Sequence, residues 1–268
     1  MKRLLFFLFL FFASIATASA DAVNLLQASS RTGSYHGYQW QDFEFDIRVD
    51  NIAYHKEVTV WYIDADGQWK SLAATYAHDI DGNQEMWHAN WQRMLSRPGC
   101  VTLSPLDLVF NVVYKVAGQT YVDDRYGQQY YLPAGSGELI TPPVLADGAT
   151  AVAPYSVNGS SYPGYFTVGV LVKNLAYHKR VAIHYTYDNW RTTHIGYATF
   201  QPSRTYGYSY VTYPNANGVE YWLFRTEGPE AQNPSATEVK YAVGYTVGGQ
   251  TYWDNNFGQD YTVQVQHR

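Results

Sequence analysis

Side chains suited to holding a sugar stand together near the C-terminus, in a run that begins with Trp253. Trp253 is followed by a carboxylate and two amides, Asp254, Asn255 and Asn256, and Trp190 ends a similar Asp-Asn-Trp run. A sugar presents C–H faces that stack on flat rings, and hydroxyl groups that need hydrogen-bond donors and acceptors. The two runs therefore indicate a sugar-binding surface, provided that hairpins bring them together. The alternative is that both tryptophans fill the end of a β-sandwich.

The elements that must position these runs are repeated along the chain. Asn-Ile-Ala-Tyr-His-Lys at 51–56 recurs as Asn-Leu-Ala-Tyr-His-Lys at 174–179, and an alternating run follows each copy. Tyr-Lys-Val-Ala-Gly-Gln-Thr-Tyr at 114–121 matches Tyr-Thr-Val-Gly-Gly-Gln-Thr-Tyr at 245–252. The order of the motifs is kept, which predicts two tandem copies of one module.

Within each copy, short runs of period two alternate with turn signals, and no stretch shows helical periodicity. This pattern predicts an all-β fold of two tandem antiparallel β-sandwich modules, immunoglobulin-like in class, with about seven or eight strands each. Gly118-Gln119 and Gly249-Gln250 are expected at tight hairpin turns.

Composition divides the chain further. Residues 1–20 have the charged, apolar and small-residue parts of a signal peptide, with a membrane anchor as the alternative. We expect the first module at 21–132, a Pro- and Gly-rich linker at 133–148 and the second module at 149–268. The mature protein is then secreted, either extracellular or periplasmic.

The ordered motifs resemble carbohydrate-binding module family 21, the starch- and glycogen-binding domains, over nearly all of the mature chain, twice. The resemblance implies α-glucan binding at Trp190, Trp253 and the polar residues 254–256. It also implies a second glucan site around the Asn-x-Ala-Tyr-x-Lys segment, at Tyr177 and Lys179 in the second module and Tyr54 and Lys56 in the first. The other reading of this segment is that Asn closes a turn while Tyr covers a sheet edge.

The first module departs from the pattern. Val122 replaces the tryptophan and Arg125 replaces the last asparagine, while Trp69 remains as a platform. This degenerate module is expected to bind weakly, to bind another glucan or to act as a spacer.

Other chemistry has weaker support. Asp64 and Asp66 lie in an Asp-x-Asp-Gly turn, whose ordinary role is hairpin closure rather than glycoside hydrolysis. His55 and His178 lack metal-ligand spacing, so neither a metal nor a cofactor is expected. Cys100 is the single cysteine, which rules out an intrachain disulfide. A net charge of -5 provides no basic field for nucleic acid.

These observations predict a secreted, non-catalytic protein that binds α-glucan, with a separate hydrolase as a further partner and with no membrane span. Three alternatives stay open at this point. The chain could be a surface or host-interaction protein that binds another polysaccharide or a glycoprotein. It could be a glycoside hydrolase with an unrecognised active site. It could also be a cytoplasmic phosphatase-targeting subunit, which a signal sequence disfavours.

Overall fold

The computed structural model describes residues 22–100, 102–227 and 236–267, and no α-helix occurs among them. The expected all-β class is confirmed. The segment expected as a signal peptide, residues 1–20, lies outside the described residues.

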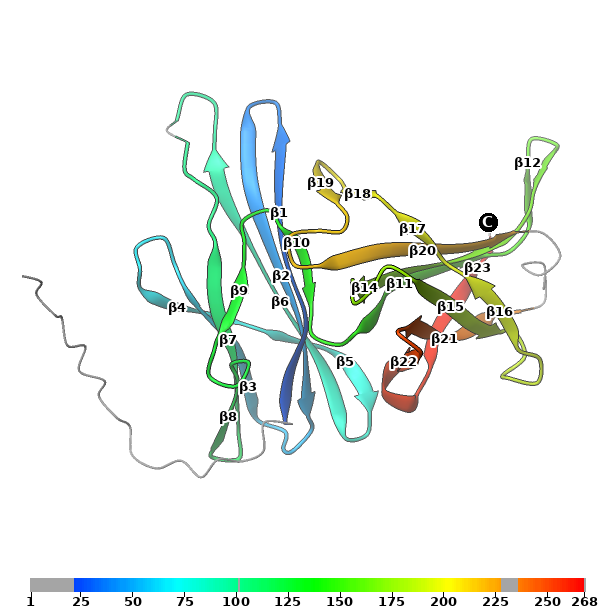
Figure 1. Cartoon of the computed structure of the whole chain (residues 1–268), viewed down its shortest axis with the longest axis horizontal. Helices are drawn as coiled ribbons and strands as arrows, with labels where there is room; N and C mark the ends of the chain where they lie inside the picture. The colour runs from blue at the N-terminus through cyan, green and yellow to red at the C-terminus, as the bar shows by residue number, and fades with distance from the viewer. Residues whose placement is uncertain (1–21, 101, 228–235, 268) are drawn as a thin grey trace, which may run out of the picture.

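The strands gather in an N-terminal half, residues 22–140, and a C-terminal half, residues 144–267, which lie side by side (Figure 1). One sheet of the N-terminal half runs in the order β5-β6-β2-β1. Its strands are β1 (Val23–Tyr35), β2 (Tyr38–Asp50), β5 (Thr75–Asp81) and β6 (Gln84–Ser96). A facing sheet runs β4-β3-β7-β8, with β9 also on β7. Its strands are β3 (Lys56–Ile63), β4 (Trp69–Ala73), β7 (Leu108–Val116), β8 (Gln119–Asp123) and β9 (Tyr130–Leu132).

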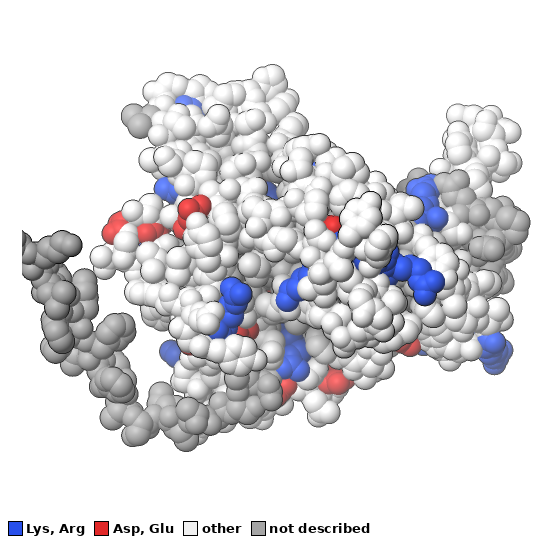
Figure 2. Space-filling model, in the orientation of Figure 1, with Lys and Arg blue, Asp and Glu red and all other residues white. Residues whose placement is uncertain are grey.

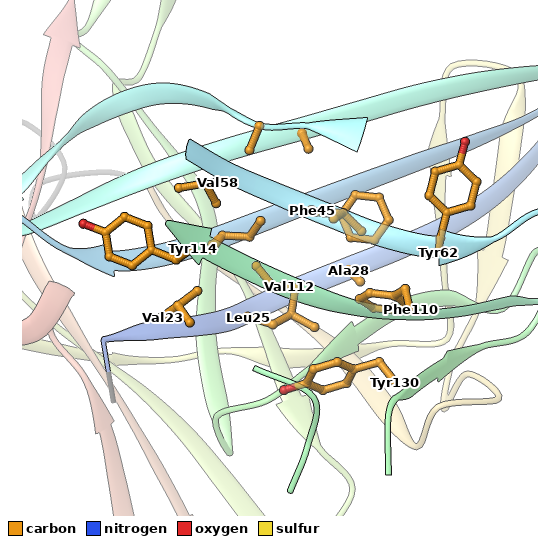
Figure 3. Packing of buried hydrophobic residues seen from close by; sticks show 14 of the residues in the cluster. Val23, Leu25, Ala28, Phe45, Val58, Tyr62, Phe110, Val112, Tyr114 and Tyr130 are labelled. Atoms are coloured by element: carbon orange, nitrogen blue, oxygen red, sulfur yellow. The ribbon is translucent and has the colours of Figure 1, made fainter. Parts of the chain in front are cut away.

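Alternation along β2 shows why these sheets face each other. Phe43, Phe45, Ile47 and Val49 are buried, whereas the residues between them are charged and partly exposed. A strand turns successive side chains to opposite faces, so one face of β2 joins the core and the other meets water. Figure 3 shows this core, in which side chains of β1 and β2, among them Phe45, lie against those of β3 and β7.

The C-terminal half holds one continuous sheet in the order β16-β15-β21-β23-β11-β14-β20-β17, with β22 also on β21. Its two parts are linked by β23, which pairs antiparallel with β21 and parallel with β11. The strands are β11 (Val144–Val152), β14 (Tyr165–Lys173), β15 (Lys179–Thr186), β16 (His194–Tyr197), β17 (Thr199–Gln201), β20 (Val219–Glu227), β21 (Glu238–Val247), β22 (Gln250–Asp254) and β23 (Tyr261–Gln266). The hairpin of β12 (Tyr155–Val157) and β13 (Ser160–Tyr162) extends from it, and a 3-10 turn covers Asn256–Gly258.

The tight hairpins expected from the sequence are confirmed, one residue earlier than placed. Ala117 and Gly118 join β7 to β8 with φ of 49° and 76°, and Gly248 and Gly249 join β21 to β22 with φ of 59° and 80°. Positive φ at both central residues is the type I′ arrangement, which matches the twist of the flanking strands.

A strand contact joins the halves to each other. Within the N-terminal half, β10 (Gly137–Ile140) pairs with β1. From the C-terminal half, β18 (Ser203–Tyr206) and β19 (Ser209–Thr212) form a hairpin whose Ser209 pairs with Gly33 on β1. The segment 133–148, expected as a linker, thus contains β10 and the first residues of β11. We call the hairpin of β18 and β19 the strap, since it reaches from the C-terminal half to a sheet of the N-terminal half (Figure 1).

Candidate functional site

Trp253 lies on β22, and its ring covers the outer face of the sheet. Its partner on β21 is Gly244, and a Cβ there would lie 3.3 Å from the indole ring. The ring also meets His184 of β15 edge-on, with centroids 4.9 Å apart. Burial lowers the pKa of His184. Glycine therefore lets the indole lie across the sheet, while 54% of the residue stays exposed to solvent.

The row that contains Trp253 continues to the edge of the sheet. Gly244 pairs with Ala182 on β15, which pairs with Tyr197 on β16. Directly paired residues share a face of the sheet, so Trp253 and Tyr197, both about half exposed, lie on one outer surface together with Ile195. We call this the outer face of the C-terminal half.

Sequence reasoning missed Tyr197 and Ile195, although their alternation with Gly196 is a strand signal. Gly196 faces the core, where a Cβ would collide with the ring of Phe224 at 2.1 Å. The two exposed side chains on either side of it must therefore point outward.

Trp190 lies in the loop between β15 and β16, where its backbone has a φ of 68°. Its backbone N–H donates to Thr186 Oγ1 at 3.0 Å, and its indole Nε1–H donates to Asp260 Oδ2 at 2.9 Å. Asp188 begins the loop, and hydrogen bonds from the Thr192 N–H and then from Thr186 lower its pKa to about 2. The hairpins thus bring the loop of Trp190 against the loop that follows Trp253.

The polar residues after Trp253 bind one another. Asp254 accepts hydrogen bonds from the Ala146 N–H at 2.6 Å and the Tyr261 hydroxyl at 2.9 Å, and burial raises its pKa. Asn255 accepts from the Gly258 N–H at 3.0 Å, and the Asn256 amide donates to the Asp260 carbonyl at 3.4 Å. These three side chains hold the shape of the loop on which Trp253 is presented.

In the Asn-x-Ala-Tyr-x-Lys segment of the C-terminal half, the lysine side chain is buried and the tyrosine side chain is exposed. Lys179 has a side chain only 4% exposed, and its Nζ donates to Glu220 Oε1 at 2.7 Å and to Asn174. Glu220 also accepts from the Trp222 indole at 3.0 Å. Tyr177, by contrast, is 90% exposed at the tip of the segment. Lys179 therefore braces the segment from within, while the tyrosine ring faces solvent.

The same brace recurs in the N-terminal half. Lys56 donates to Glu85 Oε1 and Asn51 Oδ1, both at 2.6 Å, and Glu85 accepts from the Trp87 indole at 2.9 Å. Tyr54 is as exposed as its counterpart Tyr177.

The outer face of the N-terminal half differs. Val122 is opposite Val113, so no glycine makes room for a flat ring there. Trp69 opens β4 opposite Ile63 and is partly exposed. Trp61 is also partly exposed, on the central part of β3, and sequence reasoning missed it.

Arg125, the other departure from the motif in the N-terminal half, lies in the loop between β8 and β9, and Asp123 before it makes contacts like those of Asp254. Asp123 accepts from the Leu25 N–H at 2.7 Å and the Tyr130 hydroxyl at 2.8 Å.

The side chains weighed for other chemistry have local partners. Asp64 and Asp66 both contact Lys70. The hydrogen bond from Lys70 lowers the pKa of Asp64, whereas the pKa of Asp66 is lowered first by a hydrogen bond from the Gln68 N–H and then by Lys70. Within residues 22–100, 102–227 and 236–267, no group of three or more His, Cys, Asp and Glu side chains could hold a metal ion. The described part of the chain also contains no helix long and apolar enough to cross a membrane.

Known proteins resemble parts of this chain. Glucoamylase 1 of Rhizopus oryzae is 32% identical over 129 residues, which are 47% of this chain and 19% of that protein. Protein phosphatase 1 regulatory subunit 3E of Homo sapiens is 27% identical over 132 residues, which are 49% of this chain and 39% of that protein. The matched region is thus well under half of these relatives.

Two solved structures also match parts of the chain. The starch-binding domain of R. oryzae glucoamylase, in complex with β-cyclodextrin and maltoheptaose, is 30% identical with a TM-score of 0.29, covering 44% of this chain and 97% of that domain. The carbohydrate-binding module of the muscle glycogen-targeting subunit of protein phosphatase-1 is 22% identical with a TM-score of 0.26, covering 42% and 73%. The family model that matches is the carbohydrate/starch-binding module of family 21, and it matches residues 155–264 of this chain.

Proposed function

We propose that the chain is a non-catalytic carbohydrate-binding protein whose ligand is an α-glucan such as starch or glycogen. The observation that carries this proposal is Trp253, an indole that lies across a sheet on Gly244 with half of its surface exposed. An exposed flat ring on a rigid sheet is the platform on which the C–H face of a sugar stacks. The family match over residues 155–264 supports this reading.

In the proposed site, Trp253 and Trp190 are the stacking platforms, and Tyr197 widens the outer face. Asp254, Asn255 and Asn256 act mainly by fixing the loop, because their hydrogen-bond partners lie within the protein.

Tyr177 forms a second contact surface for glucan, with Lys179 in a supporting role. The indole and the tyrosine stand on different elements, β22 and the segment before β15.

We further propose that the two halves are tandem copies of one module. The pairing of β3 with β4 and β7 is repeated by β15 with β16 and β21, and the Lys–Glu brace is repeated too. In the N-terminal copy, Tyr54, Trp69 and the brace residue Lys56 are kept. The platform at Val122 is lost, so this copy contributes the weaker binding.

Secretion is also part of the proposal, because residues 1–20 have the pattern of a signal peptide. N-terminal sequencing of the exported protein should give Asp21 as the first residue. A chain that keeps its N-terminus would contradict this part. Once outside the cell, the protein would hold a separate hydrolase near its polymer.

Adsorption to insoluble starch tests the binding proposal. We expect Trp253→Ala to weaken adsorption about tenfold or more, since a central aromatic contact contributes about 1.4 kcal/mol or more. Trp190→Ala weakens it as well. Tyr162→Ala, an exposed ring on the hairpin of β12 and β13, is the matched control and leaves it unchanged. If the unaltered protein does not adsorb, the α-glucan proposal is wrong, and a glycan array then tests other polysaccharides and glycoproteins.

Two sites on one polymer should also act together. If both halves reach one chain, avidity exceeds the affinity of either site by about 10²-fold or more. Tyr54→Ala combined with Trp69→Ala should then weaken adsorption to starch while leaving affinity for a short oligosaccharide at the C-terminal half unchanged. Equal adsorption of this variant and the unaltered protein would contradict the claim that both halves bind one polymer together.

A further inference from the structure

A cavity of about 650 Å³ lies where the two halves meet. The N-terminal half contributes Arg125, Tyr126 and Tyr131 from β9 and the loop before it, and the C-terminal half contributes Lys173 and Asn217. Sites that bind small molecules have volumes of about 300–1,000 Å³. This cavity is therefore large enough for a sugar unit, and it exists only while the halves are docked.

Two cations from different halves face this cavity. Lys173 is half-buried at the end of β14, and its Nζ donates to the Thr141 carbonyl oxygen. Burial first, and then the positive charge of Arg125, hold the pKa of Lys173 below its ordinary value. In the described part of the chain, no carboxylate forms an ion pair with either Lys173 or Arg125.

The carboxylates that line the cavity have other partners. Asp123 accepts hydrogen bonds from the Leu25 N–H and the Tyr130 hydroxyl, and Asp124 accepts from the Gly127 N–H at 2.8 Å. Both carboxylates are held by these neutral donors rather than by the side chains of Arg125 or Lys173, so an anion placed between the two cations would still lower their mutual repulsion.

Aromatic rings stand beside the cations. Tyr126 is 95% exposed, and its positive φ of 60° is strained for a residue with a Cβ. Tyr131 is about half exposed, and its hydroxyl donates to Asp107 at 2.9 Å. A ring face next to paired cations is the combination that a sugar carrying a phosphate needs, because the ring stacks and the cations take the phosphate oxygens.

The docking of the halves is built to keep this cavity in shape. Glu138 of β10 has a side chain 1% exposed and accepts from the Tyr206 and Tyr213 hydroxyls of the C-terminal half at 2.6 and 2.8 Å. Arg31 of β1 lies 3.6 Å from the same carboxylate. Asn217, which lines the cavity, donates to the Glu138 carbonyl at 3.0 Å.

We propose that the cavity between the halves binds a phosphorylated sugar unit, with the phosphate between Arg125 and Lys173 and the sugar ring against Tyr126. The site is separate from the outer face of the C-terminal half. The choice of a sugar rests on the proposed function, whereas the choice of an anionic group rests on the cations alone. A phosphorylated residue within a glucan chain and a free sugar phosphate share this chemistry.

Titration calorimetry on the full chain tests the proposal, with glucose 6-phosphate, glucose, glucuronate and inorganic phosphate as probes. We expect glucose 6-phosphate to bind more tightly than the other three. Arg125→Asn should weaken that binding about tenfold, because a charged hydrogen bond is lost. Asparagine stands at the corresponding position 256 and tolerates the positive φ of 55°. Lys173→Gln should weaken it similarly, and Lys115→Gln, exposed on β7, is the control.

Starch adsorption by the same preparations separates this proposal from the proposed function. The Arg125→Asn variant should adsorb to starch like the unaltered protein, although its affinity for glucose 6-phosphate is reduced. The proposal is overturned if glucose 6-phosphate shows no saturable binding, or if Arg125→Asn binds it as tightly as the unaltered protein. Equal binding of inorganic phosphate would contradict a role for the sugar ring in binding. Tighter binding of glucuronate would contradict the choice of phosphate as the anionic group. Phosphorylated and dephosphorylated glucan polymers then distinguish a polymer from a free sugar phosphate.

Discussion

At the scale of the residue, the position of Trp253 depends on an absent side chain. The indole can lie flat because Gly244 offers no Cβ, whereas Val113 stands at the corresponding place opposite Val122. The tryptophan is visible in the sequence, but the glycine that makes it a platform, Gly244, is nine residues earlier and is identified only once strand register is known.

Gly244→Val should therefore reduce starch binding without removing any ring. A Cβ at this position already lies 3.3 Å from the indole, and the two further methyl groups must push the ring off the sheet. We expect adsorption to starch to weaken about tenfold, as for loss of the indole. Thr246→Val, on the same face of β21, is the control. Unchanged adsorption by Gly244→Val would show that the flat position of Trp253 is unimportant.

The polar residues show a limit of sequence reasoning at this scale. Asp254 and Lys179 have the chemistry to bind sugar hydroxyls, and both are engaged inside the protein instead. Nothing local in the sequence reveals this, since their partners Ala146 and Glu220 are far along the chain. The rings of Tyr177 and Tyr54, by contrast, are exposed to solvent.

At the scale of the element, the buried Lys–Glu pair fixes the segment before β15. Lys179→Met leaves Glu220 buried without its partner, and breaking such a pair costs about 3–5 kcal/mol of unfolding free energy. Urea denaturation measures this loss. Adding Glu220→Gln should recover part of it, because the amide is uncharged and its oxygen still accepts from the Trp222 indole. Tyr177→Ala, by comparison, should leave stability unchanged. If the Lys179→Met variant were as stable as the unaltered protein, the stabilising role of the Lys179–Glu220 pair would be contradicted.

A cross-strand pair gives the N-terminal half a pH dependence. His88 of β6 is opposite Asp46 of β2, with 2.9 Å between Nδ1 and Oδ1, and this hydrogen bond raises the pKa of His88. A raised pKa in the folded state adds stability below the ordinary value of about 6.5, and that stability is lost as the pH rises through the folded value. The urea concentration at the midpoint of unfolding should therefore decrease as the pH is raised from about 6 to about 8. His88→Gln should flatten this part of the profile, and an equal slope in both proteins would contradict the assignment.

Elements that repeat a motif were the easiest to predict. The hairpins at Gly118 and Gly249 followed from Gly-Gln between alternating runs, and the structure confirms them within one residue. The sequence predicts that the runs of Trp190 and Trp253 meet if hairpins bring them together, and Trp190 does contact Asp260, in the loop that follows Trp253. β10 was not predicted, because a strand this short forms by pairing with β1, more than a hundred residues earlier in the chain. The contact of the strap with β1, between Ser209 and Gly33, also joins residues that are far apart in the sequence.

At the scale of the whole molecule, the halves are joined through a buried carboxylate. Glu138 accepts from two tyrosine hydroxyls of the strap region and lies beside Arg31. Glu138→Gln turns one acceptor into a donor that faces a hydroxyl, and we expect a loss of about 1–3 kcal/mol in unfolding free energy, measured in urea. Glu57→Gln, an exposed carboxylate on β3, is the control. Equal stability of the two variants would mean that Glu138 does not hold the halves together.

The central claim is that Trp253 is the platform on which α-glucan binds. Nuclear magnetic resonance of the indole N–H groups during titration with maltoheptaose tests it most directly, with Trp253→Phe to assign the signal. We predict that the Trp253 resonance shifts progressively to saturation. The resonances of Trp87 and Trp222, whose indoles donate to Glu85 and Glu220 within the protein, should stay in place. A saturated titration in which Trp253 does not move would contradict the account.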